Sequence, residues 1–314
     1  MAEQDYLRMF LEEKTKGIEE DIQKCISEKT DEFGRKLDSK LKEVDEMLER
    51  LNRVQGVQFV ELENDGVPTN ELAHDKIKTV IKVIASSKRA KANIMLVGGC
   101  GGGKSYMCQQ IAKLMKIPFY NLGIGAQTTK SDLVGFKTAT GGYSTTPVRQ
   151  AFENGGLLCL DEIDAGNSNV LTIMNNIISS DEIEFPDGRV KKHKDFWLIA
   201  TANTYGKGAT MDYVGRNRLD AATLDRFTMI NIDYDLQLEK TITHCDKWMH
   251  IIEQLRENID RYDLKVIVSP RASQKGADMF EAGIPVPDII EMQILKGASE
   301  DVRMKLMEGI NWED

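Results

Sequence analysis

The chain alternates between short, wholly apolar runs and longer segments in which apolar residues recur at helical spacing. Three of the short runs, at 94–97, 157–160 and 198–200, each lead into glycine or polar residues. Apolar runs of this length, bounded in this way, are typical of buried strands. The segment 74–85 shows the other pattern, with isoleucine and valine three and four residues apart, which predicts a helix. Together the two patterns predict an α/β core.

Residues 1–54 differ in character, because they are rich in Glu, Lys and Asp and contain no proline. Their sparse apolar residues predict a long helix with two registers that break near Gly34. One register is Leu11, Ile18, Ile22 and Cys25, and the heptad-like one is Leu37, Leu41, Val44, Leu48 and Leu51. Two interpretations stay open: a coiled coil that docks a partner or a neighbouring subunit, and a solvated helix folded onto the globular body.

The remaining boundaries follow from changes in the pattern. Residues 55–73 predict a linker with a short strand near 57–62 and an Asn-Asp-Gly-Val-Pro turn at 64–68. The core then spans 74–234, and from residue 235 to 314 the pattern is helical. The apolar positions that show this are Leu236, Leu238, Ile242, Trp248, Ile251, Ile252 and Leu255.

The apolar run at 94–97 leads directly into Gly-Gly-Cys-Gly-Gly-Gly-Lys-Ser, a complete Walker A loop. Its glycines let backbone N–H groups curl around the β- and γ-phosphates, and the helix that begins near Lys104 points the positive end of its dipole at them. Lys104 supplies a positive charge and Ser105 a ligand for Mg²⁺. The residues expected to bind ATP are Gly98, Gly99, Cys100, Gly101, Gly102, Gly103, Lys104, Ser105, Tyr106 and Asp161.

The run at 157–160 ends in two adjacent carboxylates, Asp161 and Glu162, which is the pattern of a Walker B strand. Neighbouring residues on a strand point to opposite faces. We therefore expect Asp161 to reach Ser105 and Mg²⁺, and Glu162 to polarise the attacking water as general base. A solvated acidic turn is the alternative, which the neighbouring Walker A loop disfavours.

Three further motifs follow in order. Asn203 lies shortly after the third apolar run, where an amide can orient the attacking water. Asp-Arg-Phe stands at 225–227 and Ser-Pro-Arg at 269–271. With the Walker motifs, this set resembles the AAA+ ATPases over roughly residues 74–280. The resemblance is to the branch that holds the MoxR-like proteins, the NorQ- and CbbQ-type activators, the cobaltochelatase subunit CobS and dynein-related domains.

The resemblance implies a parallel-sheet core with a C-terminal helical lid, assembly into a ring, in this family a hexamer, and Mg-ATP as the nucleotide. It also implies that Asn203 is sensor 1, Arg226 the arginine finger and Arg271 sensor 2. A finger supplied by the neighbouring subunit neutralises charge that develops on the transferred phosphoryl group. Arg216 and Arg218 are rival fingers, and a surface salt bridge is the alternative for each. With Glu162, these assignments complete the expected catalytic set.

Two hairpins are expected between the motifs. Residues 132–144 resemble the inserted hairpin that projects toward the ring pore in this branch, so Phe136 and Tyr143 are candidates for contact with a client, with packing as the alternative. The Pro-Asp-Gly turn at 186–188 predicts the second hairpin. A cluster of basic residues follows this turn: Arg189, Lys191, Lys192, His193 and Lys194. They are candidates for contact with DNA or an acidic partner, and the alternative is a solvent-exposed edge strand.

Composition narrows the choice of partner and compartment. Lys and Arg number 41 against 50 Asp and Glu, a net charge of -9, which disfavours a surface devoted to nucleic acid. The five cysteines are scattered without a CxxC pair, and the four histidines lack zinc-ligand spacing. There is no basic-then-apolar leader and no apolar run of membrane-spanning length. We expect a cytoplasmic protein with reduced thiols and no membrane partner.

These observations favour a ring-forming ATPase that hydrolyses Mg-ATP to remodel or activate a protein client on a separate chain. Two alternatives stay open. One is a nucleic-acid-stimulated motor that uses the basic hairpin, and the other is an oligomeric scaffold that ATP only locks, with the N-terminal helix as its working part. Stand-alone ATPases of this type occur in phage as well as bacterial genomes.

Overall fold

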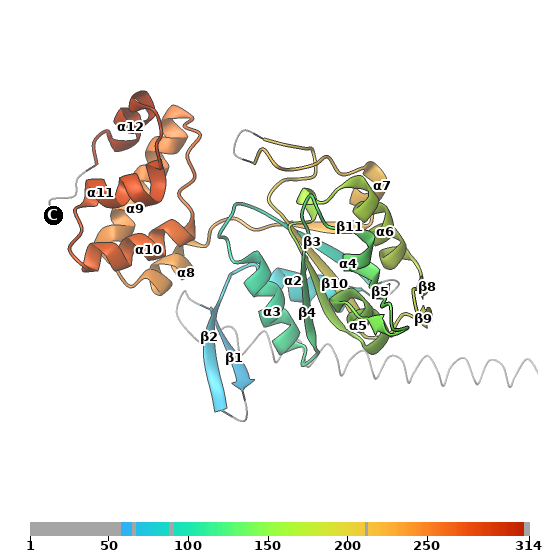
Figure 1. The fold of residues 1–314 in the computed structure, drawn as a ribbon. Coiled ribbons are helices and arrows are strands. Elements are labelled where there is room, and N and C mark those ends of the chain that lie inside the picture. Colours follow the sequence, from blue (N-terminus) through green and yellow to red (C-terminus); the bar gives the residue numbers. More distant parts are fainter. Residues whose placement is uncertain (1–57, 65–66, 88–90, 211–212, 311–314) are drawn as a thin grey trace, which may run out of the picture. The chain divides into compact units, whose positions relative to one another are not determined.

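The computed structural model describes residues 58–64, 67–87, 91–210 and 213–310. The long helix predicted over residues 1–54 lies outside the described residues. The expected strand near 57–62 corresponds to β1 (Gln58–Asn64), which pairs in antiparallel register with β2 (Val67–Ala73) (Figure 1). No strand was expected at β2, because these residues fall in the predicted linker; the structure pairs them with β1 along their whole length.

Five parallel strands form the central sheet, in the spatial order β11-β3-β10-β7-β4. Their bounds are β3 Asn93–Val97, β4 Phe119–Gly123, β7 Gly156–Asp161, β10 Phe196–Ala202 and β11 Phe227–Asn231. The three apolar runs of the sequence are the three central strands, as predicted. Ile199 of β10 pairs with Ile94 on one side and Cys159 on the other, so these strands have no open edge.

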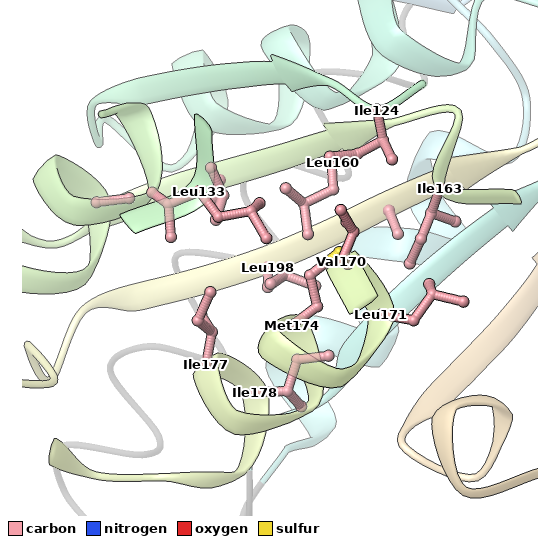
Figure 2. Close-up of a cluster of buried hydrophobic side chains, with 14 of the residues drawn as sticks. Ile124, Leu133, Leu160, Ile163, Val170, Leu171, Met174, Ile177, Ile178 and Leu198 are labelled. Carbon is pink, nitrogen blue, oxygen red and sulfur yellow. The ribbon is translucent and has the colours of Figure 1, made fainter. Parts of the chain in front are cut away.

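Helices cover both faces of this sheet, with α2 and α3 on one side and α4, α5 and α6 on the other (Figure 1). Their bounds are α2 Ile77–Ser86, α3 Lys104–Leu114, α4 Lys130–Val134, α5 Pro147–Asn154 and α6 Ser168–Ser179. Figure 2 shows the second face, where Leu160 and Leu198 of the strands pack with Val170 and Met174 of α6. Burial on both faces explains why the strands are apolar at every position rather than at alternate ones.

Short elements connect these layers. The 3₁₀ turn η1 (Ile163–Ala165) follows β7, and α7 (Ala221–Leu224) precedes β11. Both predicted hairpins are present: β5 (Phe136–Lys137) pairs with β6 (Tyr143–Ser144), and β8 (Glu182–Phe185) pairs with β9 (Gly188–Lys191).

The C-terminal helices pack around a second apolar core that centres on Trp248. They are α8 Leu236–Thr243, α9 Asp246–Tyr262, α10 Pro270–Glu281, α11 Val286–Ile290, the π-helical turn η2 Glu291–Leu295 and α12 Glu300–Met307. A Cβ atom on Gly276 of α10 would lie 2.2 Å from the indole of Trp248, so α9 and α10 can approach this closely only with glycine there. In the described part of the chain, no helix combines the length and the apolar character that a bilayer crossing needs.

Candidate nucleotide-binding site

The carboxyl ends of β3, β7 and β10 lie side by side, because these parallel strands are neighbours in the sheet. The loops that follow them therefore bring the Walker A loop, the Walker B carboxylates and Asn203 to one place, the usual position of a ligand site on an open α/β sheet. A cleft of about 650 Å³ lies there. Leu72 and His74 also line it, as do Arg271 of α10 and Glu239 of α8.

The Walker A loop has a backbone that its glycines require. A Cβ atom on Gly98 would lie 2.0 Å from the carbonyl oxygen of Ile232, and Gly101 has a left-handed φ of +77°. At the tip, the backbone N–H of Cys100 donates to the Tyr213 hydroxyl at 3.0 Å, and the Tyr234 hydroxyl donates to the Cys100 carbonyl at 3.0 Å. Two tyrosines that the sequence analysis did not single out thus hold the tip of the loop.

The predicted ATP ligands divide into two groups. The residues from Cys100 to Tyr106 line the cleft, whereas Gly98 and Gly99 are not among its lining residues and accept hydrogen bonds from Lys104 through their carbonyls. The Lys104 ammonium donates to both carbonyls at 2.8 Å and to Asn203 Oδ1 at 2.9 Å. Burial lowers the pKa of Lys104, while nearby acidic groups, Asp161 among them, oppose the shift.

Ser105 and Asp161 are in contact, as a shared cation site requires. The Ser105 hydroxyl donates to Asp161 Oδ1 at 2.7 Å, and the Thr201 hydroxyl donates to the same oxygen. Thr201 is buried and also accepts the backbone N–H of Glu162 at 3.0 Å. The sequence analysis missed Thr201, although its place two residues before Asn203, at the end of a buried strand, was the available signal.

Asp164 is a second residue that the sequence analysis missed. It is fully buried, and its Oδ2 accepts the backbone N–H groups of Asn203 at 3.1 Å and Thr204 at 2.9 Å. The Thr204 hydroxyl donates to the same oxygen at 2.9 Å. Asp164 therefore fixes the backbone turn that presents the Asn203 amide to Lys104.

Glu162 directly follows β7 and has a left-handed φ of +58°, a conformation that costs energy for a residue with a side chain. This turn takes Glu162 out of the strand alternation that the sequence predicted and leaves its side chain 52% exposed at the cleft. The Arg216 guanidinium lies 3.2 Å from Glu162 Oε2 and 3.5 Å from Asp164 Oδ1. Arg216, a rival for the finger, is thus engaged within its own subunit.

The other arginines lie in different surroundings. Arg271 lines the cleft, where its Cγ would be 3.3 Å from a Cβ atom on Gly101. Arg226 is not among the residues that line the cleft; its Nε donates to Ser179 Oγ at 2.9 Å, and it lines a separate hollow. Arg218 is exposed. The cleft is therefore lined by Arg271 of the same chain, but not by Arg226.

Comparison with known proteins agrees with this geometry. A model of the AAA domain, dynein-related subfamily, matches residues 93–227, which run from β3 to the start of β11. This segment is a dynein-related AAA domain. It belongs to the AAA+ ATPase branch that includes CobS, as the sequence motifs predicted.

Several curated relatives are similar in sequence to this chain. An uncharacterized protein of Staphylococcus epidermidis is 25% identical over 235 residues, 70% of this chain and 86% of its own length. The aerobic cobaltochelatase subunit CobS of Sinorhizobium is 24% identical over 221 residues, 62% of this chain and 66% of its own. Uncharacterized protein YojN of Bacillus subtilis is 26% identical over 152 residues, 45% of this chain and 48% of its own.

Two solved structures resemble this chain at low sequence identity. The Thermotoga maritima RuvB Holliday junction branch migration motor has a TM-score of 0.45 and 15% identity, with 75% of this chain and 69% of that chain covered. NtrX from Brucella abortus in complex with ATP has a TM-score of 0.41 and 17% identity, with 78% and 55% covered.

Proposed function

We propose that this protein is a ring-forming ATPase that hydrolyses Mg-ATP and uses that reaction to remodel or activate a partner protein. The observation that carries the proposal is the bonded set of Lys104, Asn203, Ser105 and Asp161 in one cleft that residues of the helical lid also line. A phosphate-binding lysine, a cation site and an exposed carboxylate at Glu162 are the groups that phosphoryl transfer to water requires.

In this reaction, Glu162 accepts a proton from water while the water oxygen forms a bond to the γ-phosphorus. The bond from that phosphorus to the oxygen it shares with the β-phosphate breaks, and the products are ADP and phosphate. Lys104 leaves its carbonyl partners to meet the phosphates, and Arg271 contacts them from the lid. Movement of Arg271 with the γ-phosphate would couple hydrolysis to the position of the lid.

The cleft offers a suitable site for Mg²⁺. The Ser105 hydroxyl and the Asp161 carboxylate are hard oxygen ligands that lie 2.7 Å apart beside the phosphate loop. These two residues would hold the ion, and Thr201 would orient Asp161 from behind. When bound, Mg²⁺ supplies neutralisation of charge on the phosphate oxygens.

The position of Arg226 supports a ring. Because this arginine lies away from the cleft of its own chain, it serves as a finger only if a second copy brings it to the neighbouring nucleotide. The name of the relative CobS describes a subunit of a larger enzyme, which supports a partner on a separate chain. The similarity to CobS does not imply chelatase activity, because the function proposed for this chain is ATP hydrolysis alone.

Two exposed features bear on the partner. Phe136 is 51% exposed on the β5–β6 hairpin and is the better candidate for client contact, because the Tyr143 hydroxyl donates to the Val134 carbonyl at 2.7 Å. In the basic hairpin, Arg189 and Lys191 pair with Glu184 and Glu182 across the same two strands. This internal pairing weakens the case for a nucleic-acid motor.

The first test is steady-state ATP hydrolysis against protein concentration, with oligomer size measured by light scattering in the same samples. Turnover per subunit that rises as rings form supports the proposal. Turnover that does not depend on concentration contradicts a site shared between subunits and favours an ATP-locked scaffold. Stimulation by DNA in the absence of protein partners would favour the motor.

A further inference from the structure

We infer that Arg216 is a positioning residue that holds the general base Glu162 from within the same subunit. This inference rests on the proposed ATPase function. The Arg216 guanidinium lies between the exposed Glu162 carboxylate at the cleft and the buried Asp164 carboxylate beneath it. One cation thus joins the base to the interior of the domain.

Glu162 needs such an anchor. Its backbone is bound by Thr201, but its side chain leaves the strand in a left-handed turn and is half exposed. Among the residues that the structure describes, the Glu162 carboxylate forms its ion pair and its side-chain hydrogen bond with Arg216. A flexible glutamate without that contact would sample several rotamers, and few of them place the carboxylate beside the attacking water.

Arg216 is itself firmly placed. Its side chain is only 13% exposed, and the segment around it is bound to the loop that follows β7. The backbone N–H of Asn217 donates to the Asp164 carbonyl at 2.7 Å, and the Asn217 side chain donates to the Gly166 carbonyl at 2.9 Å. These bonds hold the Arg216 backbone beside the Walker B turn, although Arg216 and Glu162 are 54 residues apart in sequence.

Asp164 explains why the cation stays there. This carboxylate is fully buried, and its Oδ1 accepts no hydrogen bond among the described residues, so Arg216 at 3.5 Å is its compensating charge. Removal of the arginine to act on a neighbouring subunit would leave a buried charge unpaired, which is costly. Since Asp164 Oδ2 also binds the backbone of Asn203, one network positions the base and the sensor together.

The first experiment compares kcat and KM for ATP in Arg216→Ala, Arg216→Lys and Lys207→Ala. Lys207 is an exposed cation on the same loop and serves as the matched control. We expect Arg216→Ala to lower kcat about 100-fold with KM changed less than about twofold, because a misplaced base leaves substrate binding intact. Arg216→Lys should restore part of the loss, since an ammonium is a point charge and contacts both carboxylates less well. Lys207→Ala should match the wild type.

The second experiment distinguishes action within a subunit from action between subunits. Arg216→Ala is mixed with Glu162→Gln, with a tag on one variant to verify joint assembly. In a mixed ring, an arginine that worked between subunits would be supplied to intact Glu162 sites, and turnover would recover. An arginine that works within its subunit gives no recovery. A parallel mixture of Arg226→Ala with Glu162→Gln should recover turnover, because Arg226 is proposed to act across the interface.

The outcomes separate the two proposals. Wild-type kcat in Arg216→Ala, a loss of ATP binding together with kcat, or recovery in the Arg216→Ala mixture each overturns the inference. Failure of the Arg226→Ala mixture to recover, with wild-type turnover independent of concentration, overturns the ring instead, and the kcat of Arg216→Ala alone then still decides the inference. No ATP turnover in the wild type would overturn both.

Discussion

The strand ends of the central sheet form two opposite edges, the carboxyl edge and the amino edge, and the cations at these two edges have different partners. At the carboxyl edge, Lys104 contacts Asn203 and Arg216 contacts Glu162, and both of these partners line the cleft; Arg216 also contacts the buried carboxylate of Asp164. At the other end of the strands, Arg226 directly precedes β11 and lines a separate hollow of about 480 Å³ with Lys91 and Lys192. The first edge has the composition of a phosphate site, and the second has none of the Walker residues.

The partners of the cations sharpen this contrast. In the hollow, the Lys91 ammonium donates to the Phe196 carbonyl at 3.0 Å and lies 4.5 Å from the centre of the Trp197 ring. Lys192 donates to the Ile178 carbonyl at 2.9 Å, and burial lowers its pKa. These lysines bind carbonyls at the ends of elements. Arg226 also has local partners, Ser179 and Ala222, and is the cation of this hollow that is proposed above as the finger for a neighbouring cleft.

The largest expected effect tests that separation. Arg226→Ala should lower ATP turnover about a thousandfold, because the charge that develops on the transferred phosphoryl group loses its neutralising partner. Binding of ATP and ring size should stay unchanged, since Arg226 is outside the cleft of its own chain. Turnover, equilibrium ATP binding and light scattering measure the three quantities. The control is Lys194→Ala in the same hollow, which should keep wild-type turnover. Wild-type turnover in Arg226→Ala would show that this arginine is not catalytic and would contradict the functional difference between the two edges.

Glu162→Gln probes the carboxyl edge itself. Turnover should fall about 100-fold or more, because the amide cannot accept the proton of the attacking water. ATP should still bind, since Lys104 and the phosphate loop are unchanged, and the variant should retain ATP long enough to capture a client. Rapid-quench measurement of a single turnover is the appropriate assay. Hydrolysis at the wild-type rate would assign the base elsewhere.

Thr201→Val examines the buried support of the same edge. Valine keeps the shape but removes the hydroxyl that binds Asp161 and accepts the Glu162 N–H. We expect the free energy of unfolding to fall by about 1–3 kcal/mol, the cost of leaving buried polar groups without a partner. Chemical denaturation measures the change, and Thr201→Ser, which keeps the hydroxyl, should lose less. Equal losses in both variants would show that packing, not hydrogen bonding, is responsible.

The smallest effects are expected away from both edges, on the basic hairpin. Arg189→Ala should change the free energy of unfolding by less than about 1 kcal/mol, because its ion pair with Glu184 is exposed on both sides. ATP turnover should be unaffected with or without added DNA. Glu184→Ala is the matched variant that removes the other half of the pair. A DNA-dependent change in turnover in either variant would restore the nucleic-acid motor as the better function.

The sequence by itself predicts the local features of this protein. Three apolar runs predict the central strands, a glycine-rich run predicts the phosphate loop, and Pro-Asp-Gly predicts the β8–β9 turn. Each of these features depends on residues that are close in the chain, where steric limits and burial act on the local conformation. The order of motifs also resembles a known family, which the AAA domain match confirms.

Only the tertiary structure decides which distant residues meet. It places Arg216 on Glu162, Asp164 under Asn203 and the two tyrosines on the Walker A loop, contacts that join residues 39 to 134 positions apart. It also places Arg226 away from the cleft that holds Arg271. No local pattern records such contacts, because they arise from the order of strands in the sheet, which sets the loops that lie side by side.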